Sequence, residues 1–264
     1  MRRLIALAAS LMLATACGPG PQARSSGSPH PSPTPAPASA SQFPDIEESE
    51  ALAMSEPVRF RAADGVPLEG RMFGSGQVGI VLAHMRPGDQ SQWLQFAALL
   101  ATEGYRVLTY NRRGTCPGGE LGCSGGTGTG DDWKDLEPAV HLVRAAGSRR
   151  VVVGGASLGA MESLYALSRG LEADGLIWVS GFDFYGLVPI QRQVRDVVVP
   201  KLFVAGESDR GAAALLSVFD RAAPPPKKIV LLATGEHGTE ILTYADPSVA
   251  DELRQTVLDF LDTI

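Results

Sequence analysis

The chain has 264 residues, of which 44% are hydrophobic and 20% are charged, and its net charge is −6. This composition is typical of a globular protein and excludes a disordered or fibrous chain. The acidity argues against a nucleic-acid partner, because no basic face compensates the negative charge.

The first 17 residues, MRRLIALAASLMLATAC, have the pattern of an export signal. Arg2 and Arg3 precede an apolar run that is too short to span a bilayer as a stable helix. The stretch LATAC resembles a bacterial lipobox, in which Cys17 is lipidated and becomes the mature N-terminus, although Leu13 lies one place further from the cysteine than usual. This resemblance implies an exported protein, anchored by lipid on the extracytoplasmic face of the cell membrane. An ordinary signal peptide or a buried cysteine is the alternative.

Residues 18–56 are predicted to form a disordered tether. From residue 18 to about residue 42 the sequence is rich in Pro, Ser, Ala and Gly, as in SPHPSPTPAPASAS. It lacks the apolar residues that would offset the entropy of ordering, and its alternating prolines favour an extended chain. The segment would hold a folded domain, residues 57–264, away from a membrane surface. A disordered tail without this role is the alternative.

Cys116 and Cys123 bracket a turn-rich segment, PGGELG. In an exported protein such a pair indicates a disulfide that closes a short surface loop. A redox or metal-binding pair is the alternative, but the spacing matches neither usual pattern. The four histidines and three cysteines form no cluster with zinc-ligand spacing, so we expect neither a metal nor an organic cofactor.

Short apolar runs alternate with helical periodicity from residue 57 onward. Residues 57–72 contain two strand-like runs around Asp64-Gly65, which is a hairpin signal. Further strands are expected at residues 79–84, 105–110, 149–155, 174–181, 197–206 and 227–234. Helices are expected at residues 91–105, 131–147, 157–170, 211–222 and 246–264. The alternation predicts an α/β fold with a mostly parallel, doubly wound sheet and an antiparallel hairpin at one edge. The short segment 182–196 leaves no room for a large cap domain.

The stretch Gly155-Ala156-Ser157-Leu158-Gly159 has the pattern G-x-S-x-G between a predicted strand and a predicted helix. A sharp corner there points the serine away from the backbone, and the flanking glycines avoid steric clash. The N-terminus of the following helix favours developing negative charge. Ser157 is therefore a candidate nucleophile, and a plain turn is the alternative.

A serine hydroxyl is a weak nucleophile unless a base removes its proton and an acid orients that base. Asp209 lies just past the strand at 197–206, and His237 lies just past the strand at 227–234. The carboxyl ends of parallel strands share one edge of a sheet, so we expect both residues near Ser157. The chain order Ser, Asp, His is that of doubly wound hydrolases. Asp183 and Glu207 are alternative acids.

The segments GGASLG, GESD, GEHGTE and LAHMRP together resemble the α/β-hydrolase family over most of residues 57–264. The resemblance implies that Ser157 is the nucleophile, Asp209 the acid and His237 the base. It also implies that the backbone N–H groups of Leu158 and Arg86 bind the oxyanion.

The segment LAHMRP contains Met85 and His84. Met85 stands where the family usually has glycine, and its own N–H is the alternative second donor to the oxyanion. His84 precedes the serine and is interpreted as structural, holding this segment by hydrogen bonds. Dienelactone-hydrolase-like members of the family carry cysteine at the elbow, whereas this chain carries serine.

These features predict an exported, lipid-anchored serine hydrolase that transfers an acyl group from a small-molecule or acyl substrate to water. A carboxylic ester is the expected bond because the fold lacks a deep capped pocket, and a thioester or peptide bond stays open. The other class of function is a non-catalytic surface lipoprotein that uses the hydrolase fold for binding. The sequence does not indicate an oligomeric state.

Overall fold

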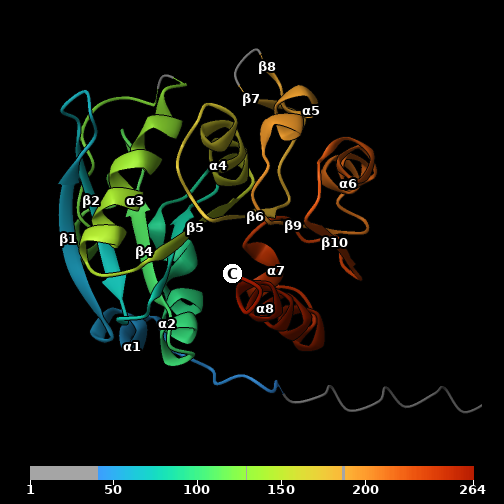
Figure 1. The fold of residues 1–264 in the computed structure, drawn as a ribbon. Helices are drawn as coiled ribbons and strands as arrows, with labels where there is room; N and C mark the ends of the chain where they lie inside the picture. Colours follow the sequence, from blue (N-terminus) through green and yellow to red (C-terminus); the bar gives the residue numbers. More distant parts are fainter. Residues whose placement is uncertain (1–40, 129, 186–187) are drawn as a thin grey trace, which may run out of the picture. The chain divides into compact units, whose positions relative to one another are not determined.

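The computed structural model describes residues 41–128, 130–185 and 188–264 (Figure 1). The fold is that of the unit that spans residues 38–264. The predicted export signal, Cys17 and the tether up to residue 40 lie outside the described residues.

An eight-stranded sheet with the order β1-β2-β4-β3-β5-β6-β9-β10 organises the domain. The pairs β1–β2 and β2–β4 are antiparallel, and the pairs from β4 to β10 are parallel. The strands are β1 (Ser55–Arg61), β2 (Pro67–Phe73), β3 (Val78–Ala83), β4 (Arg106–Asn111), β5 (Arg150–Ala156), β6 (Gly175–Val179), β9 (Lys201–Gly206) and β10 (Lys227–Leu232). The predicted mostly parallel sheet with an antiparallel hairpin at one edge is confirmed.

Helices connect the parallel strands and cover both faces of the sheet (Figure 1). The α-helices are α1 (Glu48–Ala53), α2 (Leu94–Thr102), α3 (Leu136–Ala145), α4 (Leu158–Ser168), α5 (Ile190–Gln193), α6 (Arg210–Ala222), α7 (Glu240–Thr243) and α8 (Pro247–Leu261). Short 3₁₀ turns occur at η1 (Gln90–Trp93), η2 (Gly119–Leu121), η3 (Asp132–Asp135) and η4 (Val194–Asp196). None of the helices in the described part of the chain is long and apolar enough to cross a membrane.

Two hydrophobic cores lie on opposite faces of the sheet. Successive side chains of β3 alternate between them, since Ile80 and Leu82 join the core under α2 and α8, whereas Val81 and Ala83 join the core under α3, α4 and α6. Burial on both faces explains why the central strands are continuous apolar runs.

The ordered domain begins earlier than the sequence indicated. Residues 41–56 were expected to belong to the tether, but they contain α1 and the first residues of β1. Ile46 is buried in the core, and the hydroxyl of Ser41 and the backbone N–H of Gln42 donate to the Asp251 carboxylate of α8, each over 2.7 Å. These few apolar and polar contacts order a segment whose composition alone predicted disorder.

The connection between β6 and β9 carries only small elements. It contains a two-stranded ribbon, β7 (Phe184–Tyr185) and β8 (Val188–Pro189), followed by α5 and η4. The sequence did not predict this ribbon, because two-residue strands leave no periodic pattern. No large cap is evident in the described residues, as predicted.

Candidate active site

Ser157 lies at a sharp corner between β5 and α4. Its backbone has φ 50° and ψ −114°, a conformation that non-glycine residues rarely adopt. Holding a residue there costs about 1–3 kcal/mol, and such strain is concentrated at functional sites. Its N–H donates to the Val179 carbonyl of β6 over 2.9 Å, and α4 begins at Leu158 directly behind it. The corner therefore has the geometry that the G-x-S-x-G pattern predicts.

Both glycines of the pattern are required by close backbone contacts. A methyl group added at Gly159 would lie 2.2 Å from the Ala83 carbonyl oxygen at the end of β3. One added at Gly155 would lie 2.5 Å from the carbonyl carbon of Gly159. The absence of Cβ atoms thus lets the N-terminus of α4 press against the ends of β3 and β5, where Ser157 is held.

Asp209 and His237 meet at the same edge of the sheet. Asp209 immediately precedes α6, His237 follows β10, and His237 Nδ1 lies 2.8 Å from Asp209 Oδ2. The aspartate side chain is 13% exposed and the histidine side chain 38% exposed. A neutral imidazole that donates from Nδ1 to this carboxylate has Nε2 available to accept a proton.

The loop that carries His237 touches both the serine corner and the segment after β3. A methyl group at Gly238 would lie 3.2 Å from Ala156 Cβ and 3.8 Å from Ser157 N. The Thr239 hydroxyl donates to the sulfur of Met85 over 3.3 Å. Three segments distant in the sequence, those around residues 85, 157 and 238, are therefore packed together.

The segment after β3 supplies the candidate oxyanion donors. The N–H of Met85 donates to Gln92 Oε1 over 3.1 Å, so this group is already engaged. That contact favours Arg86 over Met85 as the donor from this segment. Leu158 is the first residue of α4, and the first N–H groups of a helix have no acceptor within it. The role of Gln92 was not predicted, because an isolated glutamine in a turn carries no sequence signal.

His84 is a buried structural histidine, as interpreted from the sequence. Its Nδ1 donates to the Met85 carbonyl over 2.8 Å, and its Nε2 accepts the N–H of Arg112 over 3.3 Å. Burial, assisted by the positive charge of Arg112, lowers the pKa of His84 to about 3. The ring is therefore neutral, with its proton on Nδ1.

The alternative acids lie elsewhere in the site region. Asp183 is exposed at the start of the β7–β8 ribbon, where its carbonyl accepts the N–H of Ile190 over 3.0 Å. Glu207 is exposed, and its N–H donates to the Leu232 carbonyl over 2.8 Å. The hydrogen bond from a carboxylate to the His237 ring comes from Asp209.

Cys116 and Cys123 form a disulfide, as the sequence predicted. The loop that it closes is fixed from inside, because the Leu121 carbonyl accepts hydrogen bonds from Gln90 Nε2 over 2.8 Å and from Asn111 Nδ2 over 2.7 Å. Within the described residues, no group of three His, Cys, Asp or Glu side chains is placed to hold a metal ion.

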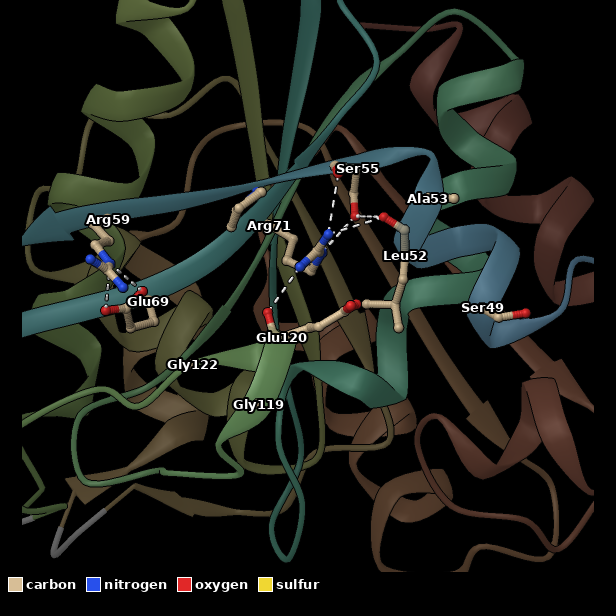
Figure 2. A pocket seen from close by; sticks show the side chains of 11 residues that line it. Ser49, Leu52, Ala53, Ser55, Arg59, Glu69, Arg71, Gly119, Glu120 and Gly122 are labelled. Atoms are coloured by element: carbon tan, nitrogen blue, oxygen red, sulfur yellow. Dashed lines mark hydrogen bonds and ion pairs between the residues drawn. The ribbon is translucent and has the colours of Figure 1, made fainter.

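A cavity of about 1030 Å³ lies over the outer face of the β1–β2 hairpin, and none of the predicted site residues lines it. Figure 2 shows Arg71 at its centre, donating to Ser55 Oγ over 2.6 Å and to the Glu120 and Leu52 carbonyls over 2.9 Å and 3.0 Å. Arg71 is buried, and these bonds fasten α1 and the disulfide loop to the hairpin. The buried arginine in the wall of this cavity therefore has a structural role.

Comparison with known proteins gives a consistent result for the fold. A family profile described as alpha/beta hydrolase fold matches residues 80–180. The comparison with curated proteins finds no match.

Three solved structures illustrate the likeness. An esterase from Pyrococcus furiosus, Pf2001, superimposes with a TM-score of 0.68 at 16% identity over 85% of this chain and 96% of its own. An esterase from Exiguobacterium antarcticum gives 0.63 at 14% identity over 78% and 99%. An acylaminoacyl peptidase from Pyrococcus horikoshii gives 0.61 at 17% identity over 79% of this chain and 41% of its own. The described domain therefore has the α/β-hydrolase fold.

Proposed function

We propose that the chain is an exported, lipid-anchored serine hydrolase that cleaves a carboxylic ester through Ser157, His237 and Asp209. The observation that carries the proposal is the 2.8 Å contact between Asp209 and His237. The loop that carries His237 packs against the strained Ser157 corner. The esterase structures to which the chain is similar support hydrolysis, although that similarity concerns the fold.

In the proposed mechanism, Ser157 Oγ attacks the substrate carbonyl carbon while His237 Nε2 accepts its proton. The Asp209 carboxylate keeps the Nδ1 proton in place and stabilises the imidazolium that forms. The tetrahedral intermediate then expels the alcohol, which takes the proton from His237. Water, activated by the same histidine, attacks the acyl-enzyme and releases the acid.

The N–H groups of Leu158 and Arg86 are proposed to bind the negatively charged oxygen of the intermediate. In a related system, removal of one such donor cost about 3–4 kcal/mol of transition-state stabilisation. Met85 is less suited to this role because Gln92 accepts its N–H. The chemistry proposed needs no metal and no organic cofactor.

A fluorophosphonate probe tests the proposal directly, since it phosphonylates an activated serine. The wild type should be labelled and should hydrolyse a short-chain p-nitrophenyl ester, and Ser157→Ala should lose both. Ser180→Ala is a matched control, because Ser180 is also buried, also directly follows a strand and also has a positive φ, of 49°. It should be labelled like the wild type.

Failure of the folded wild type to react would favour the second class of function, a binding lipoprotein on a hydrolase fold. Labelling without ester hydrolysis would direct the search to thioesters and peptides, which the same acyl-transfer chemistry cleaves. Export and lipid anchoring are proposed from the N-terminal sequence alone.

A further inference from the structure

A buried contact between an arginine and a glutamate joins the segment after β3 to helix α4. Arg112 follows β4, and its side chain is 1% exposed. One arm of its guanidinium donates to the His84 carbonyl, and the other lies 3.1 Å from Oε1 of Glu162, whose side chain is fully buried. Glu162 belongs to α4, the helix that begins immediately after Ser157. A single side chain thus bridges the two backbone segments that carry the proposed oxyanion donors.

The contacts of Arg112 also fix the direction of the Arg86 N–H. The Arg112 N–H holds the His84 ring, and that ring donates to the Met85 carbonyl. The peptide bond from Met85 to Arg86 is trans, so its N–H points opposite to its carbonyl. Because the carbonyl is held by His84, the N–H of Arg86 has one orientation.

Stability alone does not account for such a pair. Burying a guanidinium and a carboxyl group is unfavourable, at several kcal/mol for each group that is charged, and apolar residues of similar volume are often as stabilising or more so. Neither Oε atom of Glu162 makes a hydrogen bond within the described structure, so its buried carboxyl group relies on the 3.1 Å contact with the Arg112 guanidinium. The contact has a high desolvation cost and lies between two segments of the candidate site. Its role is therefore to fix the position of these segments relative to each other.

We infer that Arg112 and Glu162 are positioning residues, which hold the His84–Arg86 segment against α4 so that the N–H groups of Arg86 and Leu158 converge on one oxygen. This inference rests on the proposed function. Loss of the pair is expected to act on the transition state more than on substrate binding, because the oxyanion forms only as the reaction proceeds.

The neighbouring pair, Arg113 and Asp135, is a built-in control. Its side chains are 4% and 0% exposed, and the two Arg113–Asp135 contacts to Oδ1 measure 2.6 Å and 2.8 Å. Arg113 also binds Asp64 of the β1–β2 turn. It therefore points away from the oxyanion segment while carrying a similar buried charge.

The test compares the double variant Arg112→Met/Glu162→Leu with Arg113→Met/Asp135→Leu. The first should keep a melting temperature near the wild type but lower kcat about 10- to 100-fold, with KM changed by less than about threefold. The second should lower the melting temperature and leave kcat within about twofold. Should the control not fold, Asp135→Asn replaces it. Glu162→Gln, which keeps an oxygen facing Arg112, should recover most of the lost kcat.

The rate of amide hydrogen exchange at Met85 is a second readout, which does not require catalytic activity. Its N–H is protected by Gln92, so exchange should quicken at least tenfold in Arg112→Met/Glu162→Leu and stay unchanged in the control. If the wild type resists the fluorophosphonate probe, the proposed function is rejected. Quicker exchange of Met85 in the double variant would then still support the coupling between the two segments. Unchanged exchange or unchanged kcat in the folded double variant, or an equal loss of kcat in the control, would overturn the inference.

Discussion

The Thr239 hydroxyl donates to the sulfur of Met85, 3.3 Å away, and so joins the histidine loop to the segment after β3. Met85 stands where the α/β-hydrolase pattern usually has glycine, and its side chain is only 9% exposed. It fills the space beside Gly238. The departure from the pattern is therefore accommodated by packing between two segments of the candidate site.

This contact predicts that Met85→Ala destabilises the protein. Truncating a buried methionine typically costs about 2–5 kcal/mol, and here it also removes the acceptor of Thr239. Chemical denaturation should show the loss. Because the histidine loop would lose a support, kcat on a short-chain ester should fall as well. Met85→Leu, which restores the volume without the sulfur, should recover most of the stability, and equal stability of Met85→Ala and the wild type would contradict the packing argument.

Asp209 and Asp183 can be separated by matched substitutions. Asp209→Asn should lower kcat by several orders of magnitude, because the amide cannot hold the required tautomer of His237. Asp183→Asn should leave kcat within about twofold, since this side chain is exposed. Initial rates with a p-nitrophenyl ester decide between them. The opposite result would place the acid after β6.

The Cys116–Cys123 disulfide should stabilise the domain by about 2–3 kcal/mol, as expected for a short closed loop. Its removal in Cys116→Ser/Cys123→Ser should lower the melting temperature. The loop holds Gln90 and Asn111 through the Leu121 carbonyl, so the loss should extend to the segment around η1. Mass spectrometry of unreduced protein checks the linkage, and two freely alkylated thiols would contradict it.

The lipid anchor can be tested with the same set of cysteine variants. Cys17→Ser should move the protein out of the membrane fraction or block its processing, because this cysteine is the proposed acceptor of lipid. Cys116→Ser/Cys123→Ser should stay in the membrane fraction and serves as the control. Cell fractionation followed by immunoblotting measures both. Membrane association of Cys17→Ser equal to that of the wild type would reject the anchor.

The sheet could be predicted because its signals are local. Apolar runs of five to seven residues that alternate with helical periodicity require only the sequence around them, and the serine corner adds glycines at fixed spacing. The same reasoning placed Asp209 and His237 after neighbouring strands, where the structure brings them to 2.8 Å. Their proximity follows from the parallel arrangement of the strands.

Contacts between distant segments could not be predicted in this way. Ser41 and Gln42 are ordered by Asp251, and the composition around them gives no indication of that partner. Arg112 and Glu162 are 50 positions apart in the sequence. A charged residue such as Glu162 in a mostly apolar helix is ordinarily predicted to be exposed. Only the fold reveals that both are buried and in contact.

Two buried groups make the stability of the domain depend on pH: His84 lowers it as the pH falls, and Glu162 lowers it as the pH rises. Burial lowers the pKa of His84 from 6.5 to about 3. As the pH falls below 6.5, the unfolded chain binds a proton that the folded chain refuses, so the free energy of unfolding decreases. Burial raises the pKa of Glu162 from 4.5 to about 8. As the pH rises above 4.5, the unfolded chain releases a proton that the folded chain retains, and the free energy of unfolding again decreases.

Together these groups should place maximum stability between about pH 4.5 and 6.5, and the variant Glu162→Gln isolates the alkaline side. A shift of this size corresponds to several kcal/mol, lost gradually between pH 4.5 and 8. Urea denaturation across pH 4–9 should show a shallower decline above pH 5.5 in Glu162→Gln than in the wild type. The acidic decline, which His84 produces, should be the same in both, because the substitution leaves that ring buried beside Arg112. Parallel curves above pH 5.5 would mean that Glu162 is ionised in both the folded and unfolded chain at neutral pH, held so by Arg112 despite its burial.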